Sequence, residues 1–179
     1  MEDLLHILGA MAAKRAEMED STELFLDMAD RVVKSVAAQC GAKTDEVAIL
    51  WLTSDSKHLR FLAPKKFVHL GTIPLTKRDS IAVTVFAKKV GEANNNVPLV
   101  KHVSFFESVK LRDRVLPIQK MITVPIVHHG QTVGVAQVSR KGDTASEAGL
   151  DFTTHDVEKV QGIFEAVAPY FAQACPSRF

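Results

Sequence analysis

A pair of strand-like segments around a short turn is the feature that most restricts the fold of this 179-residue chain. Residues 121–143 read MITVPIVHHGQTVGVAQVSRKGD, in which two runs rich in valine and isoleucine flank the sequence HHGQ. Runs of β-branched residues around a glycine-containing turn are typical of a β-hairpin. We therefore expect antiparallel strands at about 120–127 and 132–139, with the doubled histidine at the turn between them.

The segment EVAILWL at residues 46–52 predicts a strand in the middle of a sheet. Both of its faces are apolar, with Val47, Ile49 and Trp51 on one and Ala48, Leu50 and Leu52 on the other. A strand of this kind has to be covered by other elements on both sides. The turn residues TSDSK follow, and HLRFLAP at residues 58–64 is expected to return as the second strand of a hairpin.

Two shorter elements are expected after this first hairpin. The segment GTIPLT at residues 71–76 predicts an edge strand, because Pro74 has no N–H to donate to a neighbouring strand. The segment DSIAVTVFAKKVG at residues 79–91 begins with a helix-capping residue, ends in glycine and predicts a short helix. The stretch GEANNNVPLV is loop-like, and residues 94–118 show no clear periodicity.

Helical periodicity opens the chain. Apolar residues recur at every seventh position, as in a coiled-coil seam interrupted by polar residues, at Leu4, Met11, Met18, Phe25 and Val32. Asp20 and Glu23 have the spacing of a capping box, so residues 3–40 form either one long helix or two with a break near 19–22. Gly41 is expected to end the helix.

A second helical pattern closes the chain. Thr153 or Thr154 is expected to cap this helix, and Asp156 lies in its first turn, where the helix dipole favours an acid. One apolar stripe has the spacing expected of a helix that covers a sheet, at Val157, Val160, Phe164, Val167 and Phe171. A second stripe contains Ile163, Ala166 and Tyr170, so one of the two stripes can cover the sheet and the other can meet a partner helix.

This order of elements predicts an α+β fold on a central antiparallel sheet of about five or six strands. Hairpins join most of the strands, and the longer helices stand at the two ends of the chain, where we expect them to pack on one face of the sheet. We divide the sequence into residues 1–19, a helical extension and candidate dimer helix, residues 20–174, a single domain, and residues 175–179, a C-terminal tail.

Charge is unevenly distributed along the chain, although its formal net charge is only +1. Residues 1–40 carry eight acids and four bases, whereas residues 57–120 carry thirteen lysines and arginines and four acids. A basic segment of this kind can hold an anionic ligand, face an acidic partner or simply face solvent, and the last of these is the commonest. The acidic N-terminal helices have the wrong sign for contact with phosphates, so we expect no nucleic-acid partner.

Cysteine usage and hydropathy indicate a cytoplasmic protein. No apolar run approaches the roughly 20 residues of a membrane-spanning helix, and the first residues lack the basic start of a signal peptide. Only Cys40 and Cys175 occur, and in a reducing compartment both are expected to be free thiols. A disulfide between them is the less favoured alternative.

Catalytic motifs are missing from the sequence. There is no nucleophile elbow, no phosphate-binding loop and no cysteine in a recognisable nucleophile context. None of the seven histidines forms an i, i+4 pair. His128 and His129 would point to opposite faces of a regular strand, and only a turn would let them share a metal. We therefore expect a hairpin tip and no metal site, no enzyme activity and no identifiable cofactor.

Taken together, four segments of the chain resemble the GAF domain family. KMITVPIVHHGQTVGVAQV is similar to the late hairpin of that family, and DFTTHDVEKVQGIFEAVAPYFAQA to its closing helix. VAILWLTSDSKHLRFLA resembles its first hairpin, and IPLTKRDSIAVTVFAKKVGEA its strand-then-helix stretch, although TKRDSIAVTV replaces a glycine-rich turn. The resemblance covers residues 20–174.

This resemblance implies a sensory or regulatory domain, often dimeric, that binds a small molecule beneath a short helix. The implied pocket would take apolar walls from Phe67, Ile81, Val85, Phe105 and Phe106, and polar anchors from His69, Lys101, His102 and Lys110. Neither Cys40 nor Cys175 matches the cysteines used by the bilin-binding or the methionine-sulfoxide-reducing branches of the family.

Two functions remain open at this level. One is a sensor that binds a small molecule without covalent attachment and signals through dimer helices to a separate output protein. The basic middle of the chain gives a mild preference for an anionic ligand. The other is a dimerisation or scaffold module whose pocket is filled by its own side chains, with Phe105 and Phe106 as the expected filling.

Overall fold

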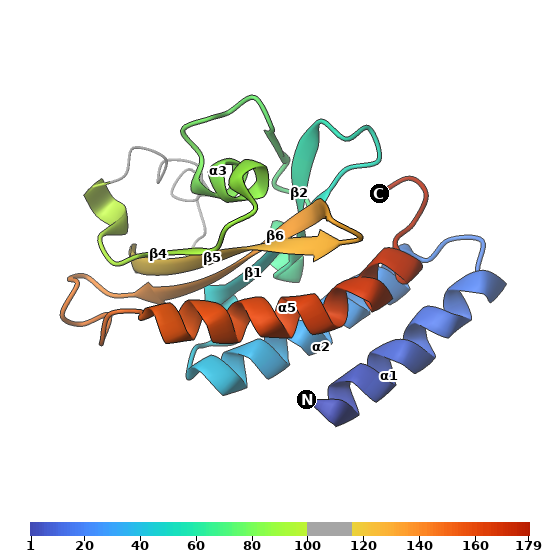
Figure 1. The fold of residues 1–179 in the computed structure, drawn as a ribbon, viewed down its shortest axis with the longest axis horizontal. Coiled ribbons are helices and arrows are strands. Elements are labelled where there is room, and N and C mark those ends of the chain that lie inside the picture. The colour runs from blue at the N-terminus through green and yellow to red at the C-terminus, as the bar shows by residue number, and fades with distance from the viewer. Residues whose placement is uncertain (100–115) are drawn as a thin grey trace.

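A six-stranded antiparallel sheet forms the middle layer of the protein (Figure 1). The structure is a computed structural model that describes residues 1–99 and 116–179. Within these residues the strands lie in the order β3-β2-β1-β6-β5-β4. Their bounds are Val47–Leu52 for β1, His58–Ala63 for β2, Thr72–Pro74 for β3, Glu92–Asn94 for β4, Ile118–His128 for β5 and Gln131–Lys141 for β6. The predicted α+β fold on an antiparallel sheet is confirmed.

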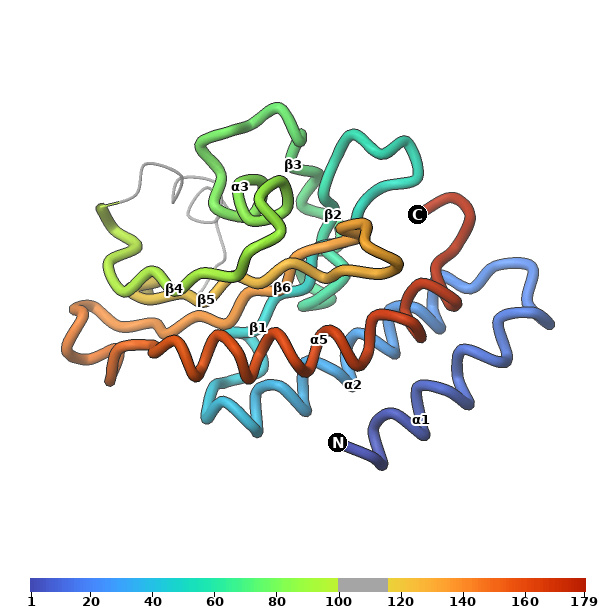
Figure 2. The backbone as a smooth tube through the Cα atoms, in the orientation of Figure 1, coloured from blue at the N-terminus to red at the C-terminus, as the bar shows by residue number. Residues whose placement is uncertain are grey.

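Helices cover both faces of this sheet (Figures 1 and 2). On one face α2 and α5 lie against the strands, and α1 packs outside them. The short helix α3 covers β5 and β6 on the opposite face. The bounds are Glu2–Ala13 for α1, Thr22–Cys40 for α2, Ile81–Lys88 for α3 and Thr154–Ala174 for α5. The N-terminal region therefore forms two helices, the second of the two alternatives that the sequence left open.

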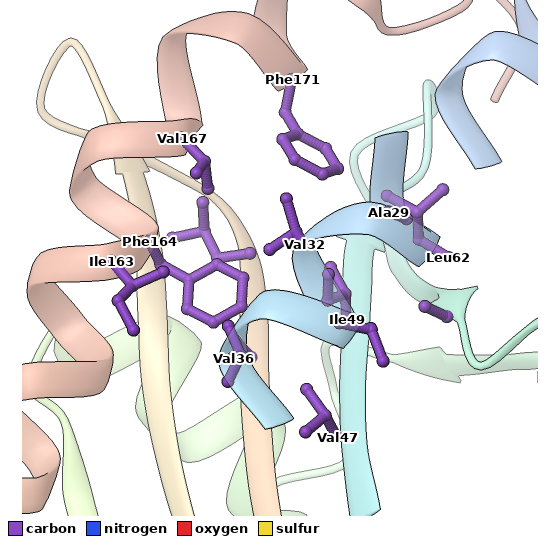
Figure 3. Close-up of a cluster of buried hydrophobic side chains, with 14 of the residues drawn as sticks. Ala29, Val32, Val36, Val47, Ile49, Leu62, Ile163, Phe164, Val167 and Phe171 are labelled. Atoms are coloured by element: carbon purple, nitrogen blue, oxygen red, sulfur yellow. The ribbon is translucent and has the colours of Figure 1, made fainter. Parts of the chain in front are cut away.

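Strand β1 is buried on both of its faces, as its sequence predicts. On the helix side, Val47, Ile49 and Trp51 pack into the larger apolar cluster, which Figure 3 shows between α2, α5 and the sheet. On the other side, Leu50 belongs to a second, smaller cluster beneath α3. Burial of apolar surface on both faces of one strand holds the three layers together.

Four aromatic rings form the end of the larger cluster. The ring of Phe25 in α2 meets the rings of Trp51, Phe171 and Phe179 with centroid distances of 5.4, 5.6 and 5.2 Å, all close to edge-on. Edge-on contacts of this kind are favoured by the quadrupoles of the rings. The backbone N–H of Ser54, in the β1–β2 turn, donates to the carbonyl oxygen of Phe179 at 3.0 Å. The segment after α5 therefore folds back over the first hairpin.

Local signals in the sequence set the ends of the long helices. Gly41 ends α2 with a φ of 61°, a left-handed conformation that glycine adopts without strain. Thr153, one of the two expected caps, caps α5, and its side chain and that of Asp156 form a capping box that the sequence analysis did not specify. At the start of α2 the expected Asp20–Glu23 box is replaced, because Asp20 accepts from the backbone N–H of Thr22 at 2.8 Å.

Three boundaries differ from the sequence predictions. The stretch thought to be a loop contains β4, which is too short and too polar to show a strand pattern. Helix α3 ends before Lys89, which takes a left-handed φ of 58°, so Gly91 lies beyond the helix. The late hairpin is longer than predicted, because strand pairing continues to a two-residue turn in which His129 and Gly130 both have positive φ.

Gly134 of β6 lies where β1 leaves no room for a side chain. A methyl group at this position would lie 2.5 Å from the carbonyl oxygen of Leu50 and 3.1 Å from the Trp51 ring. Backbone atoms in the centre of a sheet cannot move away as a side-chain end can. The Val-Gly-Val pattern after the turn is therefore a packing requirement of the β1–β6 pair.

We expect Gly134→Ala to lower the free energy of unfolding by about 2–3 kcal/mol, because it overpacks the sheet. Gly162→Ala is the matched control, since a methyl at this exposed position of α5 meets nothing within 4 Å. The control should raise stability by about 0.5–1 kcal/mol through helix propensity. Urea unfolding followed by the fluorescence of Trp51 measures both, and equal stabilities for the two variants would contradict this account.

Candidate functional site

The sheet face beneath α3, which we term the cap face, carries the candidate site. Its apolar part is a row of directly paired residues across four strands, consisting of Pro125, Val135, Leu50 and Phe61. Directly paired residues of antiparallel strands point to the same face. Helix α3 covers this side of the sheet with Ile81, Ala82, Val83 and Val85, all buried in the same cluster.

A polar row runs beside the apolar one. Glu92 of β4 pairs with Thr123 of β5, Thr123 pairs with Gln137 of β6, and Gln137 pairs with Ala48 of β1. Thr123 and Gln137 are 1% and 4% exposed, and the Gln137 carboxamide donates to the Thr123 hydroxyl oxygen at 3.3 Å. Buried polar side chains on a sheet face that is otherwise apolar are the usual means by which a binding site orients a ligand.

Chemically, the polar row offers hydrogen-bonding groups. A threonine hydroxyl can donate and accept, a glutamine carboxamide can do both, and the Glu92 carboxylate accepts. Ser139 continues the polar positions of β6, but its hydroxyl is used by the fold, because it donates to the carbonyl oxygen of Glu46 at 3.0 Å. The Thr123–Gln137 pair is thus the polar centre of the cap face.

The site residues predicted from the sequence fall into three groups. Phe67, Ile81 and Val85 all join the cap-face cluster, and the Phe67 ring meets that of Phe61 at 5.5 Å. His69 is exposed in the segment between β2 and β3. The remaining five predicted positions lie outside the described residues, and they are Lys101, His102, Phe105, Phe106 and Lys110.

Sequence reasoning missed Thr123, Gln137 and Glu92. Thr123 and Gln137 are isolated polar residues within strands that are otherwise apolar, and this pattern was a usable signal. What the sequence could not supply was the register that places them side by side. Glu92 joins them only through β4, the strand that was not predicted.

Acidic residues predominate in the helix layer, and basic residues predominate in the segment that runs from the first hairpin through α3. Helices α1, α2 and α5 together hold eight acids and three bases, whereas residues 57–99, which include α3, hold eight bases and two acids. One of these bases, Lys89 at the end of α3, links that helix to the late hairpin, because its ammonium group donates to the carbonyl oxygen of Gly130 at 2.7 Å. Another, Lys65, pairs with Asp27 of α2 at 2.9 Å.

The doubled histidine lies at the hairpin tip, as predicted, but its two rings are not on opposite faces. Their centroids are 4.0 Å apart, because His129 belongs to the turn and has a φ of 48°. Burial lowers the pKa of His128, and the neighbouring His129 ring lowers it further. Across residues 1–99 and 116–179, no group of three or more histidines, cysteines or acids is placed to bind a metal.

Both cysteines are free and half-buried. Burial raises the pKa of the Cys40 thiol and of the Cys175 thiol, so both are protonated at neutral pH and unsuited to nucleophilic attack. No helix in the described part of the chain has the length and apolar character needed to cross a membrane.

The sequence matches the profile of the GAF domain over residues 25–169. A search of curated proteins gives no match.

Several solved structures share the fold. The GAF domain of an Acinetobacter phosphoenolpyruvate-protein phosphotransferase superposes with a TM-score of 0.61 at 15% identity, covering 95% of this chain and 93% of that one. Residues 122 to 287 of a methyl-accepting chemotaxis protein give 0.62 at 16% identity, covering 92% and 96%. A type II free methionine-R-sulfoxide reductase from Thermoplasma acidophilum gives 0.60 at 17% identity, covering 85% and 95%.

Replacing Gln137 alone should lower stability more than replacing it together with its partner. Gln137→Leu leaves the buried Thr123 hydroxyl without its donor, and we expect a loss of about 1–3 kcal/mol. The double variant Thr123→Val, Gln137→Leu removes both polar groups and should recover most of that loss. Chemical denaturation of these two variants and of the single variant Thr123→Val measures this coupling, and strictly additive effects would show that the two side chains do not interact.

His128 should titrate below its ordinary pKa of 6.5 in the folded protein. As the pH falls from neutral, the unfolded chain then binds this proton first, so the histidine contributes a loss of stability on acidification. His129→Asn should move the His128 titration upward, since it removes a neighbouring positive charge and asparagine tolerates a left-handed φ. NMR titration of the ring protons tests this, and a His128 pKa that His129→Asn leaves unchanged would refute the coupling.

Proposed function

The chain belongs to the GAF domain family, and on this premise we propose that it is a sensory or regulatory domain that binds a small molecule without covalent attachment. The ligand would lie on the cap face beside α3, over the Thr123–Gln137 pair. It would signal through the helix layer to a separate output protein. In this proposal the protein catalyses no reaction.

The observation that carries the proposal is the polar row at the centre of the cap face. Thr123 and Gln137 are almost completely buried beside an apolar row, and their side chains form a hydrogen bond with each other. A protein gains little net stability from such a pair, since its groups were already hydrogen-bonded to water in the unfolded chain. Their placement is better suited to orienting a ligand.

Charge around the cap face gives the ligand a preferred chemistry. The excess of bases in residues 57–99 favours an anionic small molecule. The Glu92 carboxylate in the polar row would repel an acidic group, so the anionic part should point away from β4. His69, Lys101, His102 and Lys110 stay the proposed anchors for it, with Phe67, Ile81, Val85, Phe105 and Phe106 as the proposed walls.

The proposal also includes a homodimer formed through the helices and a cytoplasmic location. Two free, half-buried cysteines are consistent with a reducing compartment. The acidic surface of α1, α2 and α5 supports a protein partner over nucleic acid.

A second candidate is a scaffold or dimerisation module that binds no ligand. It is favoured by the close packing of the cap-face cluster, in which α3 buries four apolar side chains against residues such as Leu50, Leu59 and Val135. In that case side chains fill the space beside α3, and the polar row serves only the register of the sheet.

Native mass spectrometry of the purified protein should detect a bound small molecule. Thermal shift against nucleotides, amino acids and carboxylates should then find a stabilising compound, by about 2.7 kcal/mol at a ligand concentration of 100 times Kd. The double variant Thr123→Val, Gln137→Leu should remain folded and lose this stabilisation.

The matched control is Ser35→Ala with Gln39→Leu, which removes a similar bond between a hydroxyl and a carboxamide on α2, at 3.0 Å. This control should keep the full thermal shift. If no molecule copurifies and no compound stabilises the protein, the result supports a scaffold or dimerisation module and contradicts the proposed sensor. Equal loss of binding in both double variants would remove the cap face as the site.

A further inference from the structure

Helix α1 uses only one side of its surface within its own chain. Leu8 and Ala12 are fully buried. Gly9 lets the helix approach α5 closely, since a methyl group there would lie 3.3 Å from the Tyr170 ring. Figure 2 shows α1 as the outermost element of the helix layer, with α2 and α5 on one side of it. Tyr170 of α5 therefore contacts α1 of the same chain.

An apolar stripe of α1 lies at the edge of this contact. Leu4, Ile7 and Met11 follow one another at spacings of three and four residues, the spacing of a coiled-coil seam. Leu4 and Met11 are half-buried, and Ile7 is 39% exposed. Met18, the next apolar member of the heptad series, is 36% exposed but lies beyond the helix in extended backbone, so the seam ends with α1. The seam is therefore only half covered by the chain itself.

Opposite charges mark the two ends of this stripe. Asp3 lies in the first turn of α1, and Lys14 directly follows its last residue. Eleven residues make about three helical turns, so the two side chains share one side of the helix, roughly 16 Å apart. Both are exposed, and neither forms an ion pair with any residue in the described ranges.

We propose that the exposed side of α1 pairs with α1 of a second copy of this chain in antiparallel orientation. In that arrangement Ile7 of each chain packs against Met11 of the other, and Asp3 meets Lys14 across the interface. A parallel pair would instead bring Asp3 toward Asp3 and Lys14 toward Lys14, and these like charges repel each other. The distribution of charge along the helix therefore selects the antiparallel pair.

The proposed contact closes on itself. Each chain presents the same surface to the other about a twofold axis that passes between Ile7 and Met11 on the exposed side of α1, so two copies complete the interface and no filament forms. A 12-residue helix buries less than the roughly 800 Å² per partner of a standard interface, so the dimer should be weak and sensitive to salt. The inference rests on the homodimer of the proposed function and specifies its surface and orientation.

Analytical ultracentrifugation of three charge variants tests the orientation. Asp3→Lys and Lys14→Asp should each weaken dimerisation by roughly tenfold, since each creates two like-charge contacts. The double variant Asp3→Lys, Lys14→Asp restores both pairs in the antiparallel dimer and should return to within about twofold of the unmodified protein. Glu158→Lys, an exposed reversal on α5, controls for net charge and should leave dimerisation unchanged.

Ile7→Ser gives an independent readout, because this half-exposed side chain can be replaced without unfolding the monomer. It should weaken the dimer while the circular dichroism spectrum stays the same. A dimer whose single reversals are not rescued by the double reversal would overturn the antiparallel α1 contact but leave the homodimer standing. A protein that stays monomeric at all concentrations would overturn both the α1 contact and the homodimer. The proposed ligand binding is tested separately and does not depend on this result.

Discussion

Burial of β1 on both faces is the constraint on which the rest of the structure depends. A strand with apolar residues at every position is stable only if each face of its sheet is covered. The helix layer supplies one cover, in which Phe25 of α2 and Phe171 of α5 close around Trp51. Helix α3 and its flanking segments supply the other, and they bury the apolar side chains of the cap face.

The polar centre of the cap face depends on strand register. Thr123 and Gln137 meet because β5 and β6 form a long hairpin whose pairing continues from the two-residue turn. A shift of one residue would send both side chains to the helix face, into the largest apolar cluster. The close approach of Gly134 to β1 fixes the neighbouring register in the same way. The pairing of β1, β6 and β5 thus fixes the positions of the candidate site residues.

Much of the fold was predictable because its signals are local. The two-sided apolar pattern of β1, the Thr153–Asp156 cap of α5 and the glycine after α2 each follow from a few adjacent residues. The candidate site was less predictable. Strand β4 contains only Glu-Ala-Asn, which carries no strand signal, and its pairing with β5 brings Glu92 beside Thr123. The polar anchors expected from the sequence lie in the basic middle of the chain. The polar row, in contrast, is formed by residues of β4, β5 and β6 that are far apart in the sequence.

The central claim is that a small molecule occupies the cap face beside α3 and contacts the Thr123–Gln137 pair. A crystal structure of the protein, purified without added ligand and then again with a compound that stabilises it, tests this most directly. The account predicts ligand density over the polar row, within hydrogen-bond distance of the Gln137 carboxamide. Side chains packed against Thr123 and Gln137 in both crystals, with the compound bound elsewhere, would contradict it.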